Sequence, residues 1–349
     1  MRMVKRALLC VGLAAALLVP GTAQASTPIN VQVLVGDSCV SGTGPANAHV
    51  SAVLRTPDGR VRDNFTTMSD DTGAWGSCFS LALPSTFING NDILKIVVGN
   101  KSRTMVVPNV VPAIDRVADT ITGTVGANSL VDVEVAHHRD LKHTRQFSFT
   151  AVADSQGAWS VDTTGTVNLL GADQVIAITA VGNDLFGGLV QVPFVQLTNV
   201  DNILDGAANT GANLSFDLFD GHGHIKASTT TSALAFGQYE VSLYDGNGNA
   251  AYPVGGDQLV SNFATDATLT LPVSELRGSA SSDTISGRCM ANAHYAVLTY
   301  NNTYFGRTDS TGRLSLSVGN KENLHRADPL RLVCQYPTGD LWIRTGKVN

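Results

Sequence analysis

The stretch Asp154-Ser155-Gln156-Gly157-Ala158-Trp159 repeats a pattern that already occurs as Asp70-Asp71-Thr72-Gly73-Ala74-Trp75. A later copy, Asp309-Ser310-Thr311-Gly312-Arg313-Leu314, ends in leucine, and a weaker third copy is Ala235-Phe236-Gly237-Gln238-Tyr239. Glycine accepts the positive φ of a tight turn, and a large aromatic side chain after it is suited to a core. Each copy therefore predicts a turn that sends a large apolar residue of the next strand inward.

Three further signatures recur in the same order around this turn. An aliphatic-x-Gly pattern comes first, with glycines 81, 83 and 81 residues apart, at Gly42, Gly123, Gly206 and Gly287. An Ala-Asn pair comes next, at 46–47, 127–128, 212–213 and 291–292. An aspartate before an apolar strand comes last, at Asp92, Asp173, Asp257 and Asp328. This order predicts four repeats, with units 26–111, 112–197, 198–272 and 273–349.

Apolar residues alternate with polar ones inside each unit, which is the pattern of half-buried strands. Examples are Val31, Val33, Val35; Val131, Val133, Val135; Leu214, Phe216, Leu218; and Tyr295, Val297, Thr299. Glycine-containing turns separate these runs, and no sustained helical period follows the N-terminal segment. About 80 residues suffice for roughly seven short strands, so each unit is predicted to be an all-β sandwich.

Together, the four signatures resemble bacterial immunoglobulin-like repeats, which occur in tandem in secreted and surface proteins, including adhesins. The resemblance covers nearly all of residues 28–347. It implies four tandem immunoglobulin-like β-sandwich domains that form a stalk or a binding array. The third copy departs from the pattern because it has lost the aspartate and the tryptophan of the turn, and the fourth copy has Leu314 in place of the tryptophan.

The first 25 residues are typical of a cleaved export signal. Arg2, Lys5 and Arg6 precede the apolar run Ala7–Val19, and Ala23-Gln24-Ala25 supplies small residues for cleavage after Ala25. The apolar run is shorter than the ~20 residues that a membrane-spanning helix needs. We therefore expect a signal peptide over residues 1–25 and a secreted protein, extracellular or at the cell surface, without a membrane span.

Four cysteines remain after the predicted leader: Cys39, Cys78, Cys289 and Cys334. Four cysteines allow three pairings. The repeats favour Cys39–Cys78 and Cys289–Cys334, because each pair then lies within one unit, the first and the last. Export permits such disulfides.

Two stretches of the third unit are candidate metal ligands. His222 and His224 alternate, as two imidazoles on one face of a strand do, although their glycine-flanked context also fits an exposed turn. Asp245, Asn247 and Asn249 have the spacing that opens a calcium loop, but the expected glycine at the sixth position is Ala250 and no acid stands at the twelfth. No cofactor is expected, with calcium as the open alternative.

Charge is distributed unevenly over residues 26–349, which carry 20 basic and 29 acidic side chains, a net charge of −9. This balance argues against general nucleic-acid binding. The four units carry 0, −5, −7 and +3. The basic last unit predicts contact with an anionic polymer or with the acidic units of another molecule. The candidate binding residues are Arg313, Arg326, Arg331, Arg344 and the aromatic Trp342.

The predicted function is that of a secreted, non-catalytic binding, adhesion or spacer protein at a bacterial cell surface. Neither Gly-x-Ser-x-Gly nor His-Glu-x-x-His occurs, so we expect no enzyme. The expected partner is an extracellular protein or polysaccharide. Two alternatives stay open: a structural envelope or matrix component that self-associates, and a carbohydrate-binding accessory protein.

Overall fold

The computed structural model describes residues 28–80, 87–234, 237–263, 268–273 and 275–349. Within them the chain forms 28 strands and no α-helix, so the all-β prediction is confirmed. The predicted leader, residues 1–25, and Ala235-Phe236 of the third turn lie outside the described residues. No helix in the described part of the chain is long and apolar enough to cross a membrane.

The described strands follow one another in four groups of seven. The first group is β1 (Asn30–Val35), β2 (Cys39–Thr43), β3 (His49–Arg55), β4 (Val61–Met68), β5 (Ala74–Cys78), β6 (Ile93–Val98) and β7 (Lys101–Val106). The second is β8 (Ala113–Asp115), β9 (Thr120–Thr124), β10 (Leu130–His138), β11 (Thr144–Val152), β12 (Ala158–Asp162), β13 (Gln174–Val181) and β14 (Asp184–Gln191).

The third group is β15 (Phe194–Thr198), β16 (Ile203–Ala207), β17 (Asn213–Phe219), β18 (Ile225–Ser232), β19 (Gln238–Ser242), β20 (Gln258–Ser261) and β21 (Thr268–Thr270). The fourth is β22 (Leu276–Ser279), β23 (Thr284–Arg288), β24 (His294–Leu298), β25 (Thr303–Arg307), β26 (Arg313–Ser317), β27 (Pro329–Gln335) and β28 (Leu341–Lys347). The predicted boundary at residue 197 falls inside β15, which pairs with β16, so the third group starts no later than Phe194.

Each group is an immunoglobulin-like sandwich of three strands against four. The first, second and fifth strands of a group form the three-stranded layer, and the other four strands form the second layer. In a constant-type immunoglobulin domain the fourth strand belongs to the layer of the first strand. Here it pairs with the third strand instead, as β4 does with β3.

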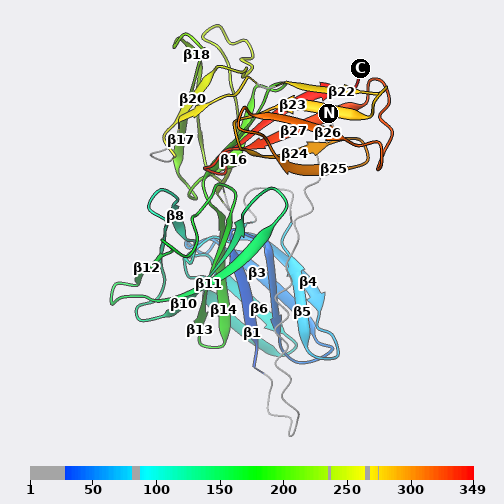
Figure 1. Cartoon of the computed structure of the whole chain (residues 1–349). Coiled ribbons are helices and arrows are strands. Elements are labelled where there is room, and N and C mark those ends of the chain that lie inside the picture. The colour runs from blue at the N-terminus through cyan, green and yellow to red at the C-terminus, as the bar shows by residue number, and fades with distance from the viewer. Residues whose placement is uncertain (1–27, 81–86, 235–236, 264–267, 274) are drawn as a thin grey trace.

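Neighbouring groups share a sheet, which the repeat pattern did not predict. The last strand of the second group, β14, pairs in parallel with β1, so four and three strands become one seven-stranded sheet. β28 pairs in parallel with β15 in the same way. The chain therefore forms two lobes, β1–β14 below and β15–β28 above (Figure 1).

The apolar cores follow this pairing. In the upper lobe the described core residues of both groups form one continuous cluster, from Val195 to Val348. In the lower lobe two clusters meet at Val111 and Val125, and Phe186 of β14 packs into the core of the first group. Strand sharing therefore merges the cores of the third and fourth groups, whereas the cores of the first and second groups stay two clusters in contact.

Each shared sheet is held at its joint by a buried aspartate. Asp184 accepts a hydrogen bond from the Val31 amide at 3.0 Å, and Asp340 accepts one from the Val195 amide at 2.8 Å. Arg103 donates to Asp184 and to the carbonyl of Ile29. The same arrangement therefore occurs once in each lobe.

In the upper lobe the cation at this joint comes from the lower lobe. Arg116, which follows β8, forms two hydrogen bonds with the carboxylate of Asp340, at 3.0 and 3.2 Å. Its guanidinium also donates to the carbonyl of Pro193 at 2.8 Å and lies 5.2 Å from the centre of the Phe263 ring. Both side chains of the pair are buried, with exposed fractions of 2% and 0%. This ion pair ties the second, third and fourth groups together.

The glycine of the aliphatic-x-Gly signature and the large residue after the turn contact each other. The glycine lies directly opposite the large residue on the neighbouring strand. A Cβ atom at Gly123 would come within 2.5 Å of Cζ2 in the Trp159 ring. The glycine thus leaves the space that the facing side chain fills. The four pairs are Gly42–Trp75, Gly123–Trp159, Gly206–Tyr239 and Gly287–Leu314.

Replacing Gly123 with alanine is expected to lower the free energy of unfolding by about 1–3 kcal/mol, the usual cost of overpacking a core. The matched control is Gly76→Ala, where a Cβ atom would have its nearest neighbour at an ordinary 3.5 Å. Urea denaturation of both variants measures the difference. Equal effects of the two substitutions would show that the glycine has no steric role.

The Ala-Asn signature marks a backbone position in the left-handed region. Asn47, Asn128 and Asn292 have φ values of 52°, 61° and 55°. In the third group this position is Gly211, with φ of 77°, and not the pair at 212–213. That part of the repeat assignment was wrong, because asparagine and glycine are the residues that tolerate this conformation and either can occupy the site.

The aspartate before the late strand closes a turn. In three groups its carboxylate is almost fully buried and accepts a hydrogen bond from the amide three residues earlier, at 2.8–2.9 Å. A cationic or imidazole side chain from another strand of the same layer contacts it. The sets are Asp92 with Arg62, Asp173 with His137, and Asp257 with Lys226. This signature is therefore structural.

Candidate functional site

The histidine candidates lie in an aspartate-capped turn. Oδ1 of Asp220 accepts hydrogen bonds from the amides of His222 at 2.8 Å and His224 at 2.9 Å. Gly223 has φ of 86°, as the glycine of the Asp70 turn does at 85°. The His224 amide makes the largest of the contributions that lower the pKa of Asp220 to about 2. The two rings lie 6.4 Å apart, centre to centre.

The calcium candidates have the same geometry. Oδ1 of Asp245 accepts the amides of Asn247 at 2.9 Å and Asn249 at 2.8 Å. These hydrogen bonds direct backbone donors at the oxygen that a cation would need. Within the described residues, no group of three or more His, Cys, Asp or Glu side chains is placed to hold a metal ion. Calcium binding at Asp245 stays a prediction.

Trp342 is the aromatic candidate, and it lies inside the molecule. Its side chain is 0% exposed in the core of the upper lobe, opposite Cys334 on β27. A ring in this position offers no face to a ligand. Trp75 and Trp159 are also buried, as expected from their places in the repeat.

Both cysteine pairs form disulfides, in the pairing that the repeats favoured. Cys39 and Cys78 lie opposite each other on β2 and β5, on one sheet. Cys289, just after β23, and Cys334 on β27 join the two layers of the fourth group. The two disulfides therefore staple the first and last groups in different ways.

The fourth group turns its acidic side chains toward itself and its neighbours. Five of its six acids accept hydrogen bonds from protein donors, which leaves their charge partly compensated. These are Asp283 with the Leu324 amide, Asp309 with the Arg313 amide, Glu322 with the Asn302 side chain, Asp328 with the His325 amide and Asp340 with the Val195 amide.

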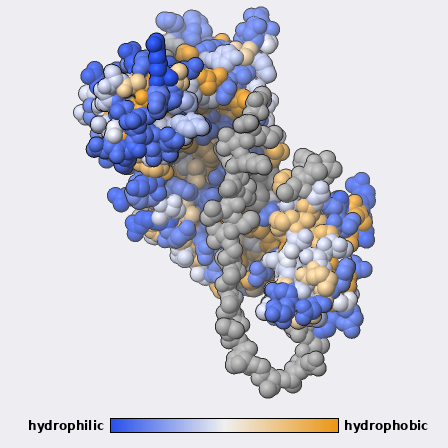
Figure 2. Space-filling model, turned by 90° about the vertical axis from the view of Figure 1, so that its right-hand side faces the viewer, coloured by the Kyte–Doolittle hydropathy of each residue, from blue (hydrophilic) through white to orange (hydrophobic). Residues whose placement is uncertain are grey.

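The basic side chains of this group point outward. Arg313, Arg326, Arg331 and Lys347 are exposed, and Arg344 is half-buried. The fourth group, with a net charge of +3, therefore presents most of these cations to solvent. On the side shown in Figure 2, hydrophilic residues dominate the upper lobe.

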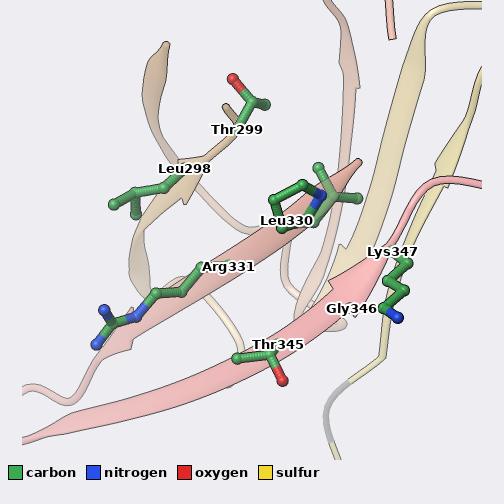
Figure 3. A pocket seen from close by; sticks show the side chains of 8 residues that line it. Leu298, Thr299, Leu330, Arg331, Thr345, Gly346 and Lys347 are labelled. Carbon is green, nitrogen blue, oxygen red and sulfur yellow. The ribbon is translucent and has the colours of Figure 1, made fainter. Parts of the chain in front are cut away.

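Two of these cations flank a groove of about 580 Å³ on the fourth group. Arg331 on β27 and Lys347 on β28 lie on opposite sides of it, with Leu330 and Thr345 between them (Figure 3). Leu298, at the end of β24, adds a second apolar contact. The groove thus offers an apolar floor between two positive charges.

The groove combines only some of the predicted binding residues. It includes Arg331, whereas Arg313 lies on β26 in the other layer and Arg326 precedes β27 outside the groove lining. Sequence reasoning missed Lys347 as a partner of Arg331. Lys347 on β28 lies opposite Pro329 on β27, which brings it near Arg331. Only the strand register reveals this placement.

Comparisons with known proteins do not assign the chain to a family. No protein-family model matches the chain, and no curated protein matches it. A tetra-tandem repeat from the extending region of a large adhesion protein shares 14% identity over 92% of this chain and 99% of its own, with a TM-score of 0.19. The BSP domain of a biofilm-associated protein shares 9% identity over 93% and 96%, with a TM-score of 0.20. Likenesses of this size assign no function.

Proposed function

We propose that the protein is a secreted, non-catalytic array of four sandwich repeats that binds anionic polymers of a bacterial cell surface through its fourth group. One observation carries the proposal: most acids of that group accept hydrogen bonds from protein donors, while two exposed bases, Arg331 and Lys347, flank an open groove. A surface of this kind attracts polyanions at long range.

The proposal predicts that Arg331→Glu/Lys347→Glu weakens retention on purified envelope polymer about tenfold. Two exposed ion pairs worth up to about 1 kcal/mol each account for this factor. The matched control is Arg60→Glu/Lys95→Glu, which changes the net charge equally at exposed positions of the first group. Retention is measured by cosedimentation over a series of salt concentrations. Equal losses in both variants, or retention insensitive to salt, would contradict a role for the fourth group.

A further inference from the structure

A second cleft lies between the two lobes. One wall is the turn between β10 and β11 in the lower lobe, and the other wall is formed by β24 and β25 in the upper lobe (Figure 1). Its volume is about 330 Å³, near the lower end of the range for small-molecule sites. The side chains that matter most here are Asp140, Lys142, His143, His294, Phe305 and Arg307.

The cleft holds positive charge that the described residues leave unneutralised. Lys142 and Arg307 are exposed, and no described carboxylate forms an ion pair with either of them. Arg307 is anchored by a hydrogen bond of 2.7 Å from its Nε to the carbonyl of Asn292, which leaves its terminal nitrogens to donate elsewhere. Two cations on opposite walls form a receptor for an anion.

The one acid in the cleft is engaged within its own turn. Asp140 accepts hydrogen bonds from the amides of Lys142 and His143 at 2.8 Å and from the His143 ring at 2.9 Å. Burial opposes ionisation, but these hydrogen bonds prevail and lower the pKa of Asp140 to about 2. Asp140 therefore fixes the turn and the His143 ring.

The remaining lining suits a sugar ring. Phe305 is 41% exposed, which is unusual for a large aromatic side chain on a strand and gives an apolar platform. The imidazoles of His143 and His294 can each donate or accept a hydrogen bond, as hydroxyl groups require. An inorganic anion would use the charges but not the aromatic face.

We propose that this interlobe cleft binds a carboxylated sugar unit of an acidic polysaccharide. The carboxylate lies between Arg307 and Lys142, the hydroxyl groups meet the two imidazoles, and the C–H face of the ring packs on Phe305. Because the walls belong to different lobes, an occupied cleft fixes one lobe against the other. This site is distinct from the groove of the fourth group and does not depend on it.

Calorimetric titration of residues 26–349, with galacturonic acid trimer as the probe, tests the proposal. We expect binding of this trimer and about tenfold weaker binding, or none, of the neutral maltotriose, because one charge-assisted hydrogen bond is worth at least that factor. Arg307→Ala, Lys142→Ala and Phe305→Ala are each expected to weaken trimer binding about tenfold or more.

The control variant Arg331→Ala/Lys347→Ala separates this site from the basic groove and is expected to bind the trimer as the unmodified chain does. Circular dichroism of each variant verifies the fold. The proposal is overturned by absence of trimer binding, by equal binding of the neutral sugar, or by loss in the groove variant with Arg307→Ala unaffected. That last outcome would support the groove as the polymer site and exclude the cleft.

Discussion

Replacing Arg116 with alanine is expected to lower the free energy of unfolding of the upper lobe by about 3–5 kcal/mol, because it leaves the buried carboxylate of Asp340 without its cation. Asp340→Ala should cost a similar amount for the converse reason. The double variant should cost less than the sum of the two, since each single change already breaks the same pair. Urea denaturation of the three variants measures these free energies.

The control for this prediction is an ion pair on the surface. Arg60 and Asp58 lie 2.8 Å apart, with side chains that are 81% and 57% exposed. Exposed pairs contribute about 1 kcal/mol or less, so Arg60→Ala should change stability little. If Arg116→Ala lowered the free energy of unfolding as little as Arg60→Ala, the buried ion pair would not be what stabilises the contact between the lobes.

Removing either disulfide is expected to destabilise the chain by about 4 kcal/mol on the chain-entropy estimate, because the cross-links span 39 and 45 residues. The paired variants are Cys39→Ala/Cys78→Ala and Cys289→Ala/Cys334→Ala. The second pair should cost more, because Cys289 and Cys334 are 4% and 0% exposed and their loss also opens a cavity between the layers.

Accessibility to a reductant separates the two disulfides without mutation. Cys39 is partly buried and Cys78 is exposed, whereas Cys334 lies fully inside the upper core. Mild dithiothreitol followed by alkylation and mass spectrometry should therefore label the first pair before the second. Labelling in the opposite order would contradict the placement of Cys289–Cys334 between the layers.

The architecture within each group could be predicted because its signals are local. The alternation at Val131, Val133 and Val135 gave the inward face correctly, and all three are 0% exposed. The sequence showed each glycine and its large partner only as members of two separate signatures. Only the strand register joins Gly123 to Trp159 as one steric contact.

The pairing of groups into lobes could not be read in the same way, because β1 and β14 are far apart in sequence. A weak signal existed: Asp184 begins the last strand of the second group, and Asp340 directly precedes the last strand of the fourth. The candidate calcium loop at Asp245 was ambiguous for another reason. An aspartate followed by turn residues can bind a cation or accept hydrogen bonds from backbone amides. In the structure, Asp245 accepts hydrogen bonds from the amides of Asn247 and Asn249.

Residue-resolved amide hydrogen exchange on the full chain tests the shared sheets most directly. We expect amides of β1, β14, β15 and β28 to exchange as slowly as those of β10 and β27, since all these strands are paired on both sides. Edge strands such as β7 and β18 should exchange faster. If β1, β14, β15 and β28 exchanged like the edges, the groups would be separate sandwiches on a string, and the two-lobe architecture would be contradicted.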